Sequence, residues 1–415
     1  MNSHKIYYGW VVVGISILAN AAILGSTTGI FGLFVVPVSA EYGLSRAGMN
    51  SVYVIISIGS AILAPLVGPV LDRVPVRPVI AAAALLLASG FAILGLSHSV
   101  WLNMVALCIM IPLGQDCGAL LTMGVLVARW FKWQLGRAMA LSALGMSLGA
   151  VIMPPVAALL MESVGWRTTL LAIGAGLFLL LLVLAALIRE HPMAQDIEPG
   201  APMSGIGRVD CTAEPSVARL KVLELLSRCE FWTIGLAVSL ASGVATTNVA
   251  SLAPFTMNSG MTMMQATSLM SITAAAAMGC KLALAWIADR VRTVSLLYLV
   301  FTLGVPLNWA LMQAQGYPAM VGCAMALGMT TGIIPPLLQT LLVERFGAAS
   351  YGSARGLVSP ILAACAAVGL LFAGRMFDRT GHYEPAFAAF MVVQVIALII
   401  LFAGERRRAP TVANA

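Results

Sequence analysis

Two ionisable side chains of this sequence, Asp116 and Lys281, stand well inside long apolar segments. A charged residue at the centre of a lipid bilayer costs at least about 2.5–3.5 kcal/mol, so such residues usually bind a ligand, relay protons or form a buried pair. The Lys281 ammonium could bind an anion, form a structural ion pair or extend toward the membrane surface. Asp116 could take up and release a proton, because burial favours a neutral carboxyl group, or it could simply bond to a neighbouring helix.

The depth of these two residues follows from helix geometry. At about 1.5 Å per residue, Asp116 lies roughly 20 Å from Arg129 at the end of its segment, and Lys281 lies about 12 Å from Asp289. Both side chains are therefore expected to reach a central cavity between two halves of the chain.

Other polar residues could line such a cavity, although Ser and Thr in membrane helices often bond to their own backbone instead. These candidates are Asn20, Thr28, Tyr53, Ser142, Thr247, Asn248, Thr331 and Ser359. Arg355 begins the eleventh apolar stretch, where it could guide anions or serve as an ordinary positive anchor.

The sequence argues against an enzyme. Its histidines fall in tails or loops: His4, His98, His191 and His382. No Ser-His-Asp set can be assembled at one depth, and no glycine-rich loop for ATP phosphates occurs. The cysteine spacing indicates neither disulfides nor a metal cluster, and no cofactor is expected.

The amino-acid composition indicates a membrane protein. Sixty per cent of its residues are hydrophobic and 9% are charged, whereas soluble domains carry about 25% charged residues. Twelve apolar stretches are long enough to cross a core about 30 Å thick. They run over 10–36, 49–71, 79–96, 101–128, 138–161, 168–188, 231–257, 264–288, 294–312, 320–343, 356–377 and 385–402. The predicted fold is an all-α membrane protein with twelve transmembrane helices in two pseudo-symmetric halves.

The placement of the basic residues predicts orientation. With the N-terminus inside, 18 of the 23 Lys and Arg residues fall on the cytoplasmic side and four fall outside, which predicts that both termini are cytoplasmic. The net charge of +7 reflects this asymmetry, so nucleic acid is not an expected partner. We expect a monomer in the cell (inner) membrane.

A short charged turn occurs twice, once in each half of the sequence. The first copy runs from Gly68 to Asp72 and Arg73, and the second from Ala285 to Asp289 and Arg290. Such a duplication predicts two similar membrane-embedded halves, as in transporters. We place them at 1–189 and 230–415, joined by a proline-containing cytoplasmic linker at 190–229. Gly114 and Gly118, like Gly328 and Gly332, are spaced for close helix packing.

The first turn resembles the loop motif of the major facilitator superfamily, Gly-x-x-x-Asp-Arg-x-Gly-Arg-Arg. Gly68, Asp72, Arg73 and Arg77 are in register, while Pro75 and Val76 depart from it, and the second copy has Ala285 in place of glycine. The resemblance implies that the loop aspartate tethers its half to the cytoplasmic end of a helix in the other half and so holds the outward-facing state. The implied latch comprises Asp72, Arg73, Asp289 and Arg290.

Three short segments are similar to monocarboxylate transporters and oxalate/formate antiporters. They are Tyr8 to Val12, Arg129 to Phe131 with Gly136, and Gly165 to Arg167. That group carries a substrate-pairing arginine eight residues before the loop aspartate, and Lys281 occupies this position. The resemblance therefore implies a secondary transporter of small organic anions, with proton symport or anion exchange by alternating access.

Two other functions stay open. In efflux of amphipathic cations or drugs, Asp116 would be the substrate counter-ion, although Lys281 would repel such substrates. A non-transporting sensor would usually carry a soluble signalling domain, for which the linker and tail of this sequence are too small.

Overall fold

The structure is a computed structural model of the full chain. It describes the backbone of residues 7–30, 33–34, 46–193, 196, 198–199, 220–314 and 316–408, and the side chains of these residues except 46–54 and 407–408. Helices dominate, and no strand occurs within these ranges.

The helices follow the predicted spans closely. The first group is α1 (Tyr8–Leu24), π-helix η1 (Gly25–Gly29), α3 (Arg46–Leu71), α4 (Val76–Leu96), α5 (Val100–Val105), π-helix η2 (Ala106–Met110), α6 (Ile111–Gly118), α7 (Leu120–Trp130), α8 (Leu135–Val164) and α9 (Trp166–Leu187). The second is α10 (Val222–Ser227), α11 (Cys229–Asn258), α12 (Met263–Ile287), α13 (Thr293–Gln313), α14 (Gly316–Phe346), 3-10 turn η4 (Ala348–Ser350), α15 (Tyr351–Thr380) and α16 (Glu384–Arg408).

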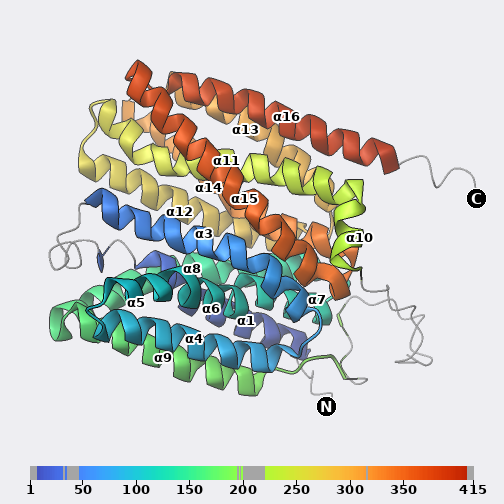
Figure 1. Ribbon diagram of the computed structural model, residues 1–415. Helices are drawn as coiled ribbons and strands as arrows, with labels where there is room; N and C mark the ends of the chain where they lie inside the picture. Colours follow the sequence, from blue (N-terminus) through green and yellow to red (C-terminus); the bar gives the residue numbers. More distant parts are fainter. Residues whose placement is uncertain are drawn as a thin grey trace, which may run out of the picture. The chain divides into compact units, whose positions relative to one another are not determined.

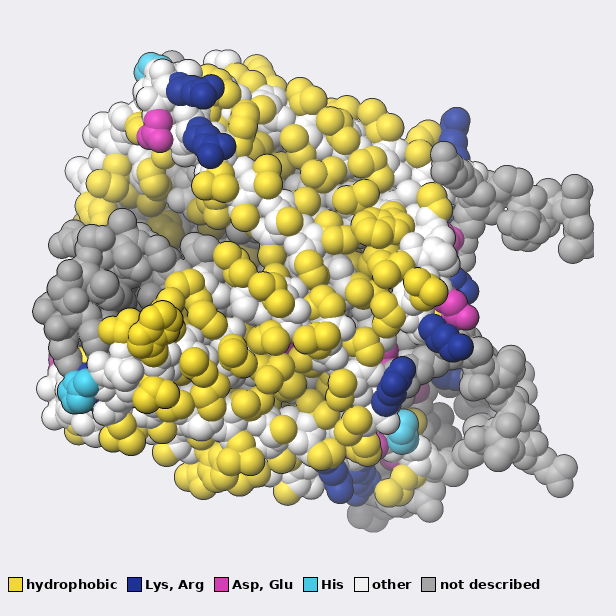
Figure 2. Space-filling model, viewed as in Figure 1, with side chains coloured by type: hydrophobic (Ala, Val, Ile, Leu, Met, Phe, Trp, Pro, Cys, Tyr) yellow, Lys and Arg dark blue, Asp and Glu magenta, His cyan; other side chains and the backbone are white. Residues whose placement is uncertain are grey.

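Among the described residues, 11 helical stretches are long and apolar enough to cross a membrane, and the apolar part of α3, Ile55–Leu71, is shorter. Figure 2 shows hydrophobic side chains over the middle of the visible face, whereas Lys, Arg, Asp and Glu side chains gather toward its left and right margins. The predicted all-α membrane fold is confirmed. The predicted end of the first span, Val36, lies outside the described residues.

The chain forms two compact units. The first comprises Met1–Leu220 with Leu342–Pro360, and the second comprises Lys221–Leu341 with Ile361–Ala415. The division predicted from the duplication, 1–189 and 230–415, remains a prediction. The compact units differ from it by grouping Leu342–Pro360 with the N-terminal helices. This segment holds the end of α14, η4 and the first ten residues of α15, where Asp72 binds.

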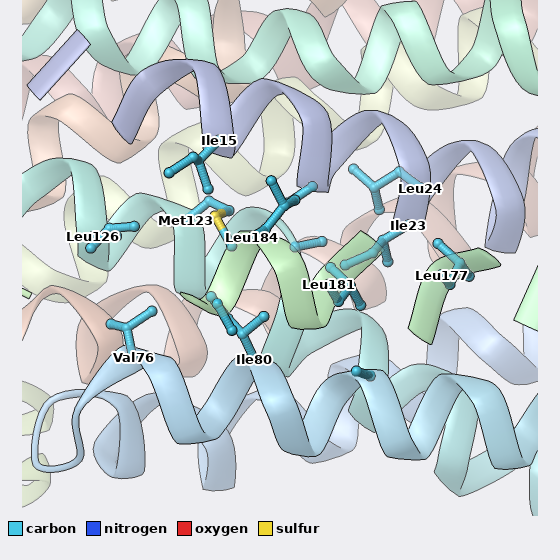
Figure 3. Close-up of a cluster of buried hydrophobic side chains, with 14 of the residues drawn as sticks. Ile15, Ile23, Leu24, Val76, Ile80, Met123, Leu126, Leu177, Leu181 and Leu184 are labelled. Carbon is cyan, nitrogen blue, oxygen red and sulfur yellow. The ribbon is translucent and has the colours of Figure 1, made fainter. Parts of the chain in front are cut away.

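In the first unit, α4 runs along α9 and α1 runs along α8 (Figure 1). Glycines allow the second pairing, because a methyl group at Gly145 would lie 2.3 Å from the Ile17 carbonyl oxygen, and one at Gly149 would lie 2.2 Å from that of Ala21. Backbone approach of this kind drives helix association in lipid. The helices enclose the apolar cluster of Figure 3, which includes Ile15, Ile23, Leu24, Val76, Ile80, Met123, Leu126, Leu177, Leu181 and Leu184.

In the second unit, α16 packs against α13 and α11. Gly328 and Gly332 of α14 meet the backbone of α12, at the carbonyl oxygens of Thr273 and Ala277. In the first unit, Gly114 packs closely against Leu87. The packing function predicted for these glycines is therefore confirmed.

The fourth predicted span, 101–128, is interrupted instead of forming one regular helix. It begins as α5, passes through η2 and α6, and breaks at Ala119, whose φ and ψ are −107° and −136°. The break removes the regular backbone donor from the Asp116 carbonyl, and the Thr122 hydroxyl donates to this oxygen at 3.2 Å. Such breaks are tolerated in membrane helices where side chains bond to the freed backbone groups.

Candidate functional site

Asp116 lies in the last turn of α6, just before the break at Ala119. It is 9% exposed. Its Oδ1 accepts a hydrogen bond from the Ser60 hydroxyl at 2.6 Å, whereas Oδ2 is buried with no hydrogen-bond partner among the described residues. The carboxyl group therefore has one satisfied and one unsatisfied oxygen, an arrangement that suits a group that gains and loses a proton.

Lys281 lies within α12, about two turns before its end, and is 1% exposed. The whole side chain is buried. The predicted burial of both residues is confirmed. Asp116 belongs to the first unit and Lys281 to the second.

Asp72 occupies the turn between α3 and α4, and its carboxylate binds the start of α15. It accepts the backbone N–H groups of Gly352 and Ser353, each at 2.8 Å, and the Ser353 hydroxyl. A negative charge is favourable there, because the first N–H groups of a helix lack partners and carry partial positive charge. The contact implied by the loop motif is thus present, and its role as a conformational latch remains a prediction.

The other predicted latch residues lie in the two turns. Arg73 is exposed beside Asp72 and lines a cavity of about 490 Å³ with Arg129, Glu190 and His191. Asp289 and Arg290 are exposed in the turn after α12, where the Arg290 N–H bonds to the Ile287 carbonyl at 2.9 Å.

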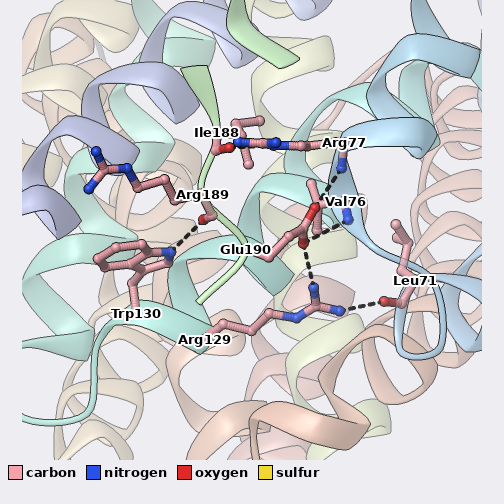
Figure 4. A network of polar contacts seen from close by, with 8 residues as sticks. All are labelled: Leu71, Val76, Arg77, Arg129, Trp130, Ile188, Arg189 and Glu190. Atoms are coloured by element: carbon pink, nitrogen blue, oxygen red, sulfur yellow. Dashed lines mark hydrogen bonds and ion pairs between the residues drawn. The ribbon is translucent and has the colours of Figure 1, made fainter. Parts of the chain in front are cut away.

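Glu190, which sequence reasoning missed, joins three helix ends of the first unit (Figure 4). Its two carboxylate oxygens accept the N–H groups of Val76 and Arg77 at 2.9 Å, and Oε2 pairs with Arg129 at 3.1 Å. Arg129 also donates to the Leu71 carbonyl at 2.9 Å. The sequence did offer one signal for Glu190, a carboxylate shortly after the sixth predicted span. Helix α4 has no capping side chain of its own, so its first N–H groups need an acceptor from elsewhere in the chain.

Glu198 provides a similar cap that sequence reasoning also missed. Its carboxylate accepts the N–H groups of Lys132, Trp133 and Gln134 at 2.8–2.9 Å, immediately before α8. The Gln134 side chain donates in return to the Pro199 carbonyl at 2.8 Å. Nothing in the sequence around Glu198 distinguishes it from other linker acids.

Two of the predicted lining residues in the first unit bond to each other. Asn20 of α1 is fully buried, and its Nδ2 donates to the Ser142 carbonyl at 3.1 Å and hydroxyl at 3.3 Å. The Thr28 hydroxyl bonds to the Leu24 carbonyl of its own chain segment. The side chain of Tyr53 lies outside the described residues.

In the second unit, Asn248 of α11 is buried and donates to Asn308 of α13 at 2.9 Å. The hydroxyls of Thr247 and Thr331 bond to carbonyls one turn earlier in their own helices. Ser359 lies in the part of α15 that belongs to the first unit, and it accepts a hydrogen bond from Arg355 at 2.8 Å. Substrate contact by any of these residues remains a prediction.

The comparisons with known proteins agree with this architecture. The sequence profile described as Major Facilitator Superfamily matches residues 16–364. Monocarboxylate transporter 13 of Rattus norvegicus is 25% identical over 406 residues, which cover 96% of this chain and 87% of that protein. Monocarboxylate transporter 12 of Mus musculus is 24% identical over 416 residues, covering 95% and 85%.

Among solved structures, the human organic anion transporter MFSD10 has a TM-score of 0.72 at 17% identity, covering 95% of this chain and 99% of that one. The E. coli fucose:proton symporter FucP also has a TM-score of 0.72, at 15% identity, with 99% and 100% covered. At these identities the structures establish the shared fold. This chain therefore belongs to the major facilitator superfamily and is an integral, multi-pass membrane transporter, not an enzyme.

Proposed function

We propose that this protein is a secondary transporter of small organic anions, and that its substrates are monocarboxylates. The observation that carries this proposal is the fully buried ammonium of Lys281 in a transmembrane helix. A cation at this depth is costly, and a substrate carboxylate would offset that cost by charge-assisted hydrogen bonds. The curated relatives named monocarboxylate transporters support the same substrate class.

Asp116 is the proposed proton-exchanging group. Its unsatisfied Oδ2 supports this role, because a buried carboxylate oxygen that accepts no hydrogen bond disfavours the charged form and favours uptake of a proton. A proton on Asp116 and an anion on Lys281 would move together, giving proton symport. Anion exchange would use Lys281 alone, with alternating access in either case.

The proposed topology has both termini in the cytoplasm and places the chain in the cell (inner) membrane, based on the distribution of Lys and Arg. The turns with Asp72, Arg73, Asp289 and Arg290 would then face the cytoplasm. There they would act as latches of the outward-facing state.

Lys281→Met in proteoliposomes of the full-length protein tests the anion site. We expect counterflow of radiolabelled lactate, pyruvate and formate to fall about 10–100-fold, since a hydrogen bond to a charged group contributes roughly 1.5–3 kcal/mol. Lys281→Arg should retain part of the activity or change the preference among these anions, because a guanidinium presents a planar fork. Lys221→Met, which removes an exposed ammonium, is the matched control. Unchanged counterflow of every carboxylate in Lys281→Met would exclude this site.

Asp116→Asn mimics the protonated carboxyl group and tests the coupling. Counterflow should persist, whereas accumulation driven by an imposed pH difference should disappear. Accumulation that survives in Asp116→Asn would show that coupling lies elsewhere. Transport of a lipophilic cation such as tetraphenylphosphonium that is lost in Asp116→Asn and kept in Lys281→Met would instead establish cation efflux, with Asp116 as the counter-ion.

A further inference from the structure

The start of α15 lies against α3 in a defined register. A methyl group at Gly68 would lie 2.2 Å from the Gly352 carbonyl oxygen, and one at Gly356 would lie 2.4 Å from that of Ala64. The contacts move back four residues on α3 for every four residues forward on α15, so the helices are antiparallel with their backbones in contact. One further helical turn brings Ser60 level with Ser359 and Pro360.

The Arg355 side chain extends along α15 to this level. Its Nη1 donates to the Ser359 hydroxyl at 2.8 Å, and that hydroxyl donates to the Arg355 carbonyl at 3.1 Å. The guanidinium is thus fixed one turn beyond its own Cα, at the depth of Ser60. The Ser60 hydroxyl in turn bonds to Asp116.

The described side chains that pack around α6 near Asp116 include five uncharged ones. The segments around α6 contribute Ile23 from α1, Thr27 from η1, Ser60 from α3, Leu87 from α4 and Thr122 from α7. Cys117 is the titratable neighbour on α6 itself. The antiparallel register of α3 and α15 places the Arg355 guanidinium at the level of Ser60, whose hydroxyl bonds to the Asp116 carboxyl group.

We propose that Arg355 is a positioning residue that links proton exchange at Asp116 to the docking of α15 on α3. When α15 is docked, the guanidinium stabilises the ionised carboxylate. When the start of α15 leaves α3, Asp116 loses this cation and takes up a proton. This inference rests on the proton-exchanging role proposed for Asp116.

The Asp72 cap sets the position of the cation in this scheme. Asp72 binds Gly352 and Ser353, three and two residues before Arg355 on the same helix. A break in the cap would therefore displace the guanidinium together with the helix start. The Asp72 turn and the Asp116 carboxyl group would therefore be coupled to each other within the first unit.

The test is an infrared pH titration of the full-length protein, with the Asp116 carboxyl band assigned by its loss in Asp116→Asn. In Arg355→Gln the protonation midpoint should rise by about 1–3 pH units, the range for loss of a nearby opposite charge. Arg355→Lys should restore most of the wild-type midpoint, because it returns the charge. Asp72→Asn should raise the midpoint in the same direction.

Arg292→Gln, which removes an exposed arginine after the second turn, is the control and should not move the midpoint. If Arg355→Gln does not fold, Ser359→Ala replaces it, since loss of the Ser359 hydroxyl releases the guanidinium and should also raise the midpoint. A wild-type midpoint in the folded variant, or no Asp116 band at any pH, would overturn the inference. Lactate counterflow in the same variants reports separately on the proposed anion transport.

Discussion

The starts of α15 and α8 occupy equivalent places in the duplicated sequence, yet they are capped differently. The sequence separation between Gly136 and Gly352, each near the start of its helix, equals that between Arg129 and Arg345 before them. The start of α15 receives the carboxylate of Asp72 on N–H groups of its first turn. The N–H groups just before α8 receive Glu198, from the long segment after α9.

The two caps differ in the conformational entropy that the chain loses when the capping carboxylate is held in place. Asp72 stands in a short turn between Leu71 and Val76, so both flanking helices hold it in place. Glu198 stands well beyond the end of α9 at Leu187, and this segment must be ordered before its carboxylate can bind. The same chemical interaction should therefore stabilise the α15 start more than the α8 start.

The largest effect is expected for Asp72→Asn. The amide has one acceptor oxygen in place of two and no charge, so at least one N–H of the α15 start loses its partner, at a cost of about 1–2 kcal/mol. If the contact is a latch, the population should shift toward inward-facing forms. Labelling of a single cysteine introduced on the outer side of a cysteine-free variant would then decrease.

Asp289→Asn is the matched variant for this measurement, because it alters the second copy of the turn. Labelling that stays at the wild-type level in both variants would remove the latch from the mechanism.

A smaller effect is expected for Glu198→Gln. The neutral side chain can still accept one N–H, and the released segment regains conformational entropy, so we expect a loss of about 0.5–1 kcal/mol. The measurements are thermal unfolding and the rate of limited proteolysis between α9 and α10, which should increase. Glu224→Gln, which alters the linker acid that caps α10, should leave the α8 start unaffected. A greater loss of stability in Glu198→Gln than in Asp72→Asn would reverse the comparison.

The smallest expected effect is the coupling free energy between the Asp72 cap and the Glu198 cap. Asp72 and Glu198 share no hydrogen-bond partner among the described residues, so the double variant should lose the sum of the two single losses within about 0.5 kcal/mol. Thermal unfolding of the two single variants and the double variant completes the cycle. A larger coupling energy would mean that the two helix starts are energetically linked.

The sequence predicted the elements that hydrophobicity specifies. Runs of apolar residues located the membrane helices, and depth alone identified Asp116 and Lys281 as buried charges. The loop motif also located the Asp72 contact. These features are predictable because the cost of a polar group in lipid acts on each residue separately.

The features that sequence reasoning missed depend on tertiary partners. Ala119 is a good helix former, and the preceding Gly118 also fits the spacing for close helix packing, so the residues there do not single out a break. Glu190 and Glu198 became caps because α4 and α8 start with no side-chain cap of their own. Their partners are far away in the sequence, beyond the reach of any periodic pattern.

The break at Ala119 has a mechanical consequence. Helix α6 is short and lies between the π-helix η2 and this break. Changes in backbone torsion at these two joints could therefore rotate α6 as a unit. A rotation absorbed at the joints would turn the Asp116 carboxyl group without moving either end of the span. The irregular backbone of the fourth span thus lies on both sides of the short helix that carries Asp116, and not within it.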